Sequence, residues 1–165
     1  MDALFQAPMT FCTSKATAAA GTTTTFSTTG STLYCIKGKA FTTSAAANAA
    51  TPTTDAATGT TFTAVAVGYG CAFVLCYDGT STTAATAIKV VQGPQQALDA
   101  SGIFINAPQF PGIPDTLCPF AYLITKVGST GSAWTFGSSN LAGPPTGVTH
   151  TFVDVMVLPG RPQVS

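Results

Sequence analysis

Apolar and polar side chains alternate along several short segments of this chain of 165 residues. Residues 32–41, 61–67 and 134–136 show this period of two, which is typical of strands with one covered face. Residues 71–77 form a continuous apolar run, which predicts a strand covered on both faces. A second apolar run at residues 87–91 follows a loop rich in threonine and alanine, so the two runs are expected to pair as a hairpin.

The last third of the chain continues the same pattern. Residues 120–127 and 149–158 are rich in apolar and β-branched side chains and predict two further strands. Five prolines in residues 94–119 remove backbone donors, so this stretch is expected to be an extended connection. About eight strands with turn signals between them indicate an all-β fold, an antiparallel β-sandwich or a jelly-roll-like barrel.

Residues 13–32 and 42–61 consist mainly of threonine, alanine, serine and glycine. Such segments are either disordered linkers or ordered loops and extended arms. Their low content of charge and proline favours order, so the fold is expected to carry long Thr/Ala-rich loops. The length fits a single β domain, residues 1–165, in which residues 1–30 are a candidate extended N-terminal arm.

Charged residues make up only 7% of the chain, glutamate does not occur, and the net charge is zero. Solvent-facing helices draw on Glu and Lys, so at most one short helix is expected. A neutral chain has no field to attract nucleic acid or an anionic membrane, and it lacks the repulsion that keeps copies apart. No apolar run approaches the roughly 20 residues of a membrane span, and the acidic start differs from that of a signal peptide.

The five cysteines are Cys12, Cys35, Cys71, Cys76 and Cys118. An odd number without a recognisable signal peptide predicts reduced, buried thiols rather than a disulfide framework. Cys71 and Cys76 lie five positions apart, so within one strand their side chains would point to opposite faces. Because the chain has one histidine and no CxxC motif, we expect no zinc site.

The single histidine, His150, lies four positions before Asp154 in an expected strand. Both side chains would share a face, but about two pleats apart, whereas a catalytic pair needs hydrogen-bond reach. The six aspartates are isolated in the sequence, and several stand beside Gly, Ser or Pro, where a carboxylate caps a turn. We therefore expect no catalytic residue, no metal site and no cofactor.

Several segments together carry a family resemblance: residues 34–40, 97–102, 108–115, 118–123 and 151–163. They resemble structural proteins encoded in the virion-gene blocks of tailed bacteriophages, and within this group the chain is most similar to capsid decoration, or cement, proteins. The likeness covers most of the chain and consists of turn and packing motifs without catalytic content. It implies a small β domain bound outside the shell at capsomer junctions, with no active-site residues to transfer.

The resemblance implies that the chain is made in the bacterial cytoplasm and acts on the capsid exterior. Its expected partners are the major capsid protein and further copies of itself, as a homotrimer or, alternatively, a dimer. Two other functions stay open as alternatives. One is a head-fibre or tail-associated attachment protein, and the other is a carbohydrate-processing β-sandwich enzyme.

Apolar residues near the chain ends and isolated basic residues are candidates for the assembly interface. These are Leu4, Phe5, Phe11, Lys37, Lys39, Leu158 and Arg161. Lys37 and Lys39 alternate around Gly38 and are expected to point the same way in one strand. They either meet an acidic patch on a partner or protect a strand edge from unwanted pairing. For the apolar candidates, core packing is the alternative.

Overall fold

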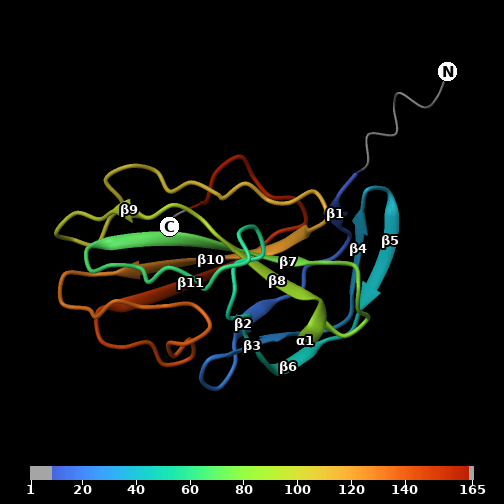
Figure 1. Cartoon of the computed structure of the whole chain (residues 1–165), viewed down its shortest axis with the longest axis horizontal. Coiled ribbons are helices and arrows are strands. Elements are labelled where there is room, and N and C mark those ends of the chain that lie inside the picture. Colours follow the sequence, from blue (N-terminus) through green and yellow to red (C-terminus); the bar gives the residue numbers. More distant parts are fainter. Residues whose placement is uncertain (1–8, 164–165) are drawn as a thin grey trace.

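The computed structural model describes residues 9–163 and consists almost entirely of antiparallel strands. The elements in chain order are β1 (Phe11–Cys12), β2 (Ala18–Ala20), β3 (Thr25–Thr28), β4 (Thr32–Ile36), β5 (Lys39–Thr43), β6 (Ala46–Ala50), β7 (Tyr69–Tyr77), α1 (Ala84–Ala87), β8 (Ile88–Gln92), β9 (Gln96–Ala97), β10 (Cys118–Val127) and β11 (Val148–Asp154). Within residues 9–163 these strands form three sheets in a sandwich-like arrangement, and α1 is the only helix (Figure 1). The all-β fold class predicted from the alternating pattern is confirmed.

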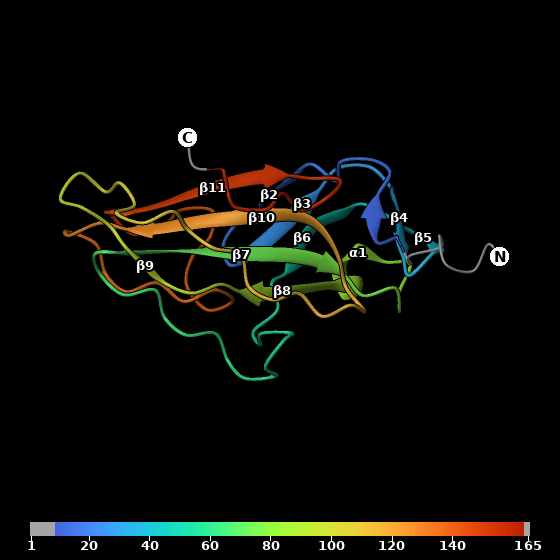
Figure 2. The same ribbon diagram turned by 90° about the horizontal axis from the view of Figure 1, so that it is seen from above.

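A central sheet of five strands runs along the length of the molecule, in the order β11-β10-β7-β8 with β9 also paired to β7 (Figures 1 and 2). Its middle strands β7 and β10 come from apolar segments, and eight of the nine residues of β7 are buried. Both faces of β7 are covered, as the continuous apolar run predicted. The hairpin of β7 and β8 is also confirmed, with Val74 opposite Val91.

Two smaller sheets, β1-β4-β5 and β2-β3-β6, are formed by the first fifty residues. The second of these sheets is built from the Thr/Ala-rich segments, where the sequence predicted long loops. Phe26, Ala46 and Ala49 are buried on it, while most of its other side chains lie partly or fully in solvent. Residues 51–61 form a loop as predicted, whereas residues 18–20, 25–28 and 46–50 pair as strands, because small and β-branched side chains suit a pleated surface without any long apolar run.

Residues 32–41 form a tight hairpin rather than the single strand that was predicted. β4 ends at Ile36, Lys37 and Gly38 make the turn, and β5 begins at Lys39. Both turn residues have a positive φ, 50° for Lys37 and 78° for Gly38, as a two-residue type I′ turn requires. Lys37 and Lys39 therefore do not alternate along one strand, and that prediction was wrong.

Residues 61–67 and 134–136 were each predicted to form a strand, but they are joined only by an isolated bridge. Val65 and Trp134 exchange both backbone hydrogen bonds, at 2.8 and 3.1 Å. Trp134 is fully buried, and its indole N–H donates to the carbonyl of Asn140 at 3.0 Å. The buried apolar residues in these segments anchor two loops to the core, and the segments do not pair as strands of a sheet.

The central sheet carries a hydrophobic core on each of its faces. The larger core includes Phe73 and is covered by the two smaller sheets and by the loops that carry Val65 and Trp134. The smaller core lies beneath the proline-rich connection between β9 and β10 and includes Val74 and Phe110. Cys71 belongs to the larger core and Cys76 to the smaller one, so their thiols point to opposite faces as predicted.

The first thirty residues, a candidate extended arm, contain β1, β2 and β3. Cys12 is 1% exposed, and its N–H donates to the carbonyl of Met156 at 2.8 Å. From Phe11 onward this stretch is therefore integrated into the domain rather than extended from it. Leu4 and Phe5, two of the candidate interface residues, lie outside the described residues.

Candidate interaction surfaces

Two candidate interface residues, Lys37 and Leu158, are brought together at one end of the molecule. Both line a groove of about 340 Å³ whose wall also includes Thr10 and Val157. The Nζ of Lys37 lies 2.6 Å from Oδ2 of Asp115, and both side chains are largely exposed. An exposed ion pair of this kind adds little to the stability of the fold.

Phe11 and Lys39 lie on the β1-β4-β5 sheet at this same end. Phe11 is half-buried and stands opposite Cys35 in the β1–β4 pairing. Lys39 begins β5, an edge strand of its sheet, and its Nζ lies 5.2 Å from the centre of the Phe41 ring. A lysine on an edge strand agrees with the edge-protection hypothesis, because its charge disfavours pairing with another strand.

Arg161, the last candidate, lies apart from the others in the segment that follows β11. It lines a groove of about 440 Å³ together with Pro108 and Phe110. The structure thus places Phe11, Lys37, Lys39 and Leu158 at or near one end of the molecule, whereas Arg161 belongs to a different surface.

A group of exposed apolar side chains that was not predicted from the sequence occupies the opposite end. We call it the Ile103 tip; it consists of Val67, Tyr69, Ile103 and Ile105. Ile103 and Ile105 are 61% and 62% exposed, which is unusual for isoleucine. The alternation of isoleucines around Phe104 is the sequence signal that would have indicated it, because residues two apart in an extended segment face the same way.

The Ile103 tip is held in place by backbone and turn contacts and by Phe104, which packs against the smaller core between the two isoleucines. The carboxylate of Asp99 accepts hydrogen bonds from the N–H of Ser101 at 2.8 Å and from that of Ile103 at 2.9 Å. The N–H of Ile105 donates to the carbonyl of Ala97 at 3.0 Å, which ties the loop to β9. The isoleucine side chains are therefore exposed to solvent on a loop that these hydrogen bonds hold in place.

The end that carries Lys37 also exposes apolar side chains. We call this group the Met9 end; it consists of Met9, Leu33, Met156 and Val157. Backbone hydrogen bonds link Met9 to Gly38 and Met156 to Cys12, so these residues gather around β1 and the β4–β5 turn. Figure 1 shows β9 and the β4–β5 pair at opposite ends of the long axis, so the two apolar groups are far apart.

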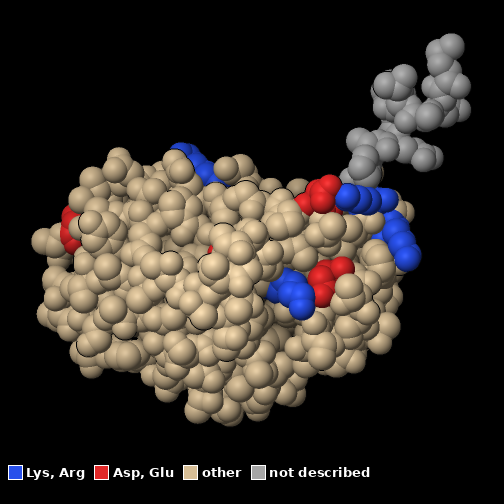
Figure 3. Space-filling view, viewed as in Figure 1, with Lys and Arg blue, Asp and Glu red and all other residues tan. Residues whose placement is uncertain are grey.

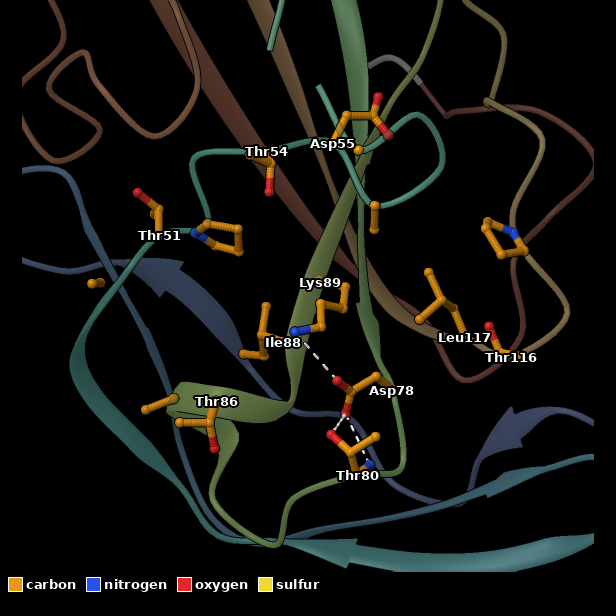
Figure 4. Close-up of a pocket in the computed structure, with 16 residues that line it drawn as sticks. Thr51, Thr54, Asp55, Asp78, Thr80, Thr86, Ile88, Lys89, Thr116 and Leu117 are labelled. Carbon is orange, nitrogen blue, oxygen red and sulfur yellow. Dashed lines mark hydrogen bonds and ion pairs between the residues drawn. The ribbon is translucent and has the colours of Figure 1, made fainter. Parts of the chain in front are cut away.

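A third feature is a groove of about 610 Å³ between the segment after β6, the α1–β8 region and the loop before β10 (Figure 4). Threonine hydroxyls and small apolar side chains make up most of its lining. Its charged groups are Lys89, Asp78 and Asp55, and Lys89 Nζ lies 3.3 Å from Asp78 Oδ2.

Both carboxylates of this groove are already hydrogen-bonded to the protein itself. Asp78 accepts from the N–H and the hydroxyl of Thr80 at 2.9 and 2.8 Å. Asp55 accepts from the N–H of Ala57 at 2.7 Å and from that of Gln92 at 3.1 Å. These bonds close a turn and fasten a loop to the edge of β8, which is the turn role expected for isolated aspartates.

Comparisons with models of known protein families, with curated proteins and with solved structures found no match to this chain. The residues of the chain itself therefore carry any inference about function. Across residues 9–163, no three His, Cys or acidic side chains gather closely enough to hold a metal ion. In the same part of the chain, no helix is long and apolar enough to cross a bilayer.

His150 and Asp154 both lie on β11, but their side chains form hydrogen bonds to different strands. His150 Nδ1 shares a hydrogen bond of 3.0 Å with the hydroxyl of Thr125, and its ring lies 4.6 Å from that of Trp134. Asp154 accepts a hydrogen bond of 2.7 Å from the N–H of Ala18 on β2. Both side chains are thus occupied in packing and in strand-to-strand contacts.

Proposed function

We propose that this chain is a capsid decoration protein of a tailed bacteriophage, which binds the outside of the assembled shell and bridges neighbouring major capsid protein subunits. The observation that carries the proposal is the presence of exposed apolar groups at both ends of the long axis, the Ile103 tip and the Met9 end. A rigid β domain with a contact surface at each end is able to touch two neighbouring subunits at once. The role is non-enzymatic.

The exposed apolar side chains supply the energy for this binding. Covering an isoleucine side chain that water now reaches contributes about 1.5–3 kcal/mol when burial is complete. Ile103 and Ile105 are each about three-fifths exposed, so covering either one contributes less than this full value. Because one partner surface would cover both, the two contributions add. Because the decoration protein would bind only the assembled lattice, mass action stabilises that state, and repeated contacts add avidity.

The weak charge of the surface supports dense packing on a shell. Most of the face in Figure 3 is uncharged, and the charged atoms form small separate spots. Two of the six basic residues are already paired, Lys37 with Asp115 and Lys89 with Asp78. A partner that covers the uncharged part of this surface removes few charges from water, a step that would be costly.

The hydrogen bonding of the acidic groups favours this role over that of an enzyme. General acid–base chemistry needs a carboxyl or imidazole group that is free to exchange a proton with a substrate. Asp55 and Asp78 accept hydrogen bonds within their own turns, and His150 lies against Trp134. The threonine-lined groove is better suited to an extended, uncharged segment of a partner protein.

The copy number of the chain in purified particles tests the proposal. Symmetry-related sites over a whole shell would give on the order of hundreds of copies per particle. Quantitative mass spectrometry against the major capsid protein measures this ratio. A dozen copies or fewer would instead indicate the head-fibre or tail-attachment alternative, and absence from purified particles would rule out both virion roles.

Substitution of the two apolar groups tests the bridging geometry. We expect the double variant Ile103→Ser/Ile105→Ser, and separately Val157→Ser, to bind shells that lack the protein at least about tenfold more weakly, with unchanged melting temperature. Ala133→Ser, a change at another exposed position, serves as the matched control and should bind like the wild type. Full binding by both end variants would contradict a contact at each end.

A further inference from the structure

Cys12 and Cys118, which are 106 positions apart in sequence, meet in the larger core. Their sulfur atoms lie 3.6 Å apart, and the two residues are 1% and 0% exposed. Cys12 belongs to the short N-terminal strand β1, whereas Cys118 opens the central strand β10. The pair thus sits where the beginning of the domain contacts its middle sheet.

The backbone on both sides of this pair is held in position. The N–H of Cys12 donates to the carbonyl of Met156 at 2.8 Å, and Cys12 stands opposite Tyr34 in the β1–β4 register. Cys118 stands opposite Tyr77 in the β10–β7 register. A disulfide has an S–S bond of about 2.05 Å, so the two sulfurs need to approach by only about 1.5 Å, within reach of small side-chain rotations.

The other three cysteines are placed differently. Cys35 neighbours Tyr34 on β4, so its side chain leaves the strand on the face opposite to that of Tyr34 and Cys12. Cys71 and Cys76 lie on opposite faces of β7. Among the five cysteines, all of which lie within residues 9–163, the contact of 3.6 Å joins the sulfurs of Cys12 and Cys118.

We propose that Cys12 and Cys118 are a site of intramolecular disulfide formation, which fastens β1 covalently to the central sheet under oxidising conditions. The oxidant is a low-molecular-weight disulfide such as oxidised glutathione. The proposal does not depend on the capsid role, since it rests on the geometry of the two thiols alone.

The reaction balances as two successive thiol–disulfide exchanges. Cys118 remains on the central strand β10 when β1 moves away, so Cys118 is the first nucleophile once its thiol has lost a proton. Its thiolate attacks one sulfur of the oxidant, the S–S bond of the oxidant breaks, and one small thiolate leaves and takes up a proton. Cys12 then loses its proton and attacks Cys118 Sγ, which releases the second small thiol. Two protein thiols are oxidised, and one small disulfide is reduced to two thiols.

The oxidant reaches the buried pair through a local opening of β1. This strand has two residues and lies at the edge of its sheet, paired only to β4 within that sheet. Short edge strands open at a lower free energy than central strands such as β7 and β10. The reaction is therefore expected to be slow compared with that of an exposed thiol, but to require no unfolding of the central sheet.

The test uses the full-length protein, purified with a reductant that is then removed, and incubated with oxidised glutathione. We expect free-thiol counting after unfolding to fall from five to three, the intact mass to fall by two hydrogen atoms, and peptide mapping to join residue 12 to residue 118. We also expect the melting temperature to rise by roughly 5–15 °C, because the bond closes a long loop in the unfolded chain.

Three variants make the assignment specific. Cys12→Ser and Cys118→Ser should each abolish the loss of thiols and the rise in melting temperature, whereas Cys35→Ser, the matched control, should retain both. The wild-type measurement decides the matter even where a core variant folds poorly. Five free thiols after prolonged oxidation, a stable mixed disulfide with glutathione, or a cross-link between any other pair would overturn the proposal.

Discussion

At the scale of single residues, His150 is the ionisable group whose surroundings matter most for the pH dependence of stability. Burial against Trp134 disfavours the charged imidazole and lowers the pKa of His150 from 6.5 to about 4, although the nearby carbonyl of Asn140 opposes the shift. The buried Nε2 has no hydrogen-bond partner among residues 9–163. The His150 imidazole is therefore neutral in the folded protein down to about pH 4.

This lowered pKa predicts that the protein loses stability as the pH falls below about 6.5. The unfolded chain takes up a proton at His150 near that pH, whereas the folded chain does so only near pH 4. Between these values the free energy of unfolding should fall by about 2 kcal/mol on account of this residue, after allowance for the part of the ring that water reaches.

Chemical denaturation at a series of pH values checks this prediction, with His150→Gln as the reference. Aspartates also titrate toward acid pH, so the quantity to compare is the difference in slope between the two proteins. The wild type should lose stability more steeply than His150→Gln between pH 6.5 and 4, and the two should run parallel above pH 7. Equal slopes throughout would show that the imidazole is not shielded from protonation.

At the scale of secondary-structure elements, one side chain links two sheets. Asp154, the last residue of β11, accepts a hydrogen bond of 2.7 Å from the N–H of Ala18 on β2. Ala18 is 8% exposed, so the loss of this acceptor would leave a buried N–H without a partner. The contact joins the edge of the central sheet to the sheet formed by the Thr/Ala-rich segments.

We therefore predict that Asp154→Ala lowers the free energy of unfolding by about 1–3 kcal/mol, whereas Asp154→Asn, which keeps an acceptor oxygen, loses less. Urea denaturation measures both. Asp115→Ala provides the control, because its carboxylate is exposed and forms an exposed ion pair with Lys37, so its effect should stay below about 1 kcal/mol. An Asp154→Ala protein as stable as this control would mean that the two sheets do not depend on the contact.

At the scale of the whole molecule, we predict that the protein associates with itself. The net charge is zero, and the exposed apolar side chains at the Met9 end and the Ile103 tip provide surfaces that association would cover. A trimer fits the threefold and quasi-threefold junctions of an icosahedral shell, while a dimer is the commonest closed oligomer in general. Sedimentation over a range of concentrations distinguishes them, and a monomer at every concentration would contradict self-association.

The elements that depend on local pattern were determined by the sequence itself. The apolar runs at residues 71–77 and 120–127 predicted the two middle strands of the central sheet, and the near absence of helix-favouring charged residues predicted an all-β fold. The opposite orientation of Cys71 and Cys76 also followed from the period of two. For the strands and the two cysteines, neighbouring residues contain the whole signal, because the backbone geometry of a strand sets it.

Only the tertiary structure decided which distant residues meet. The contact of Cys12 with Cys118, the shared groove of Lys37 and Leu158 and the link from Ala18 to Asp154 all join segments far apart in the chain. Such contacts depend on strand register and on the path of the loops, which a local alternation of side chains does not specify. The Thr/Ala-rich segments show the same limit: pairing with neighbouring strands and a buried Phe26 made them a sheet, although their composition alone suggested loops.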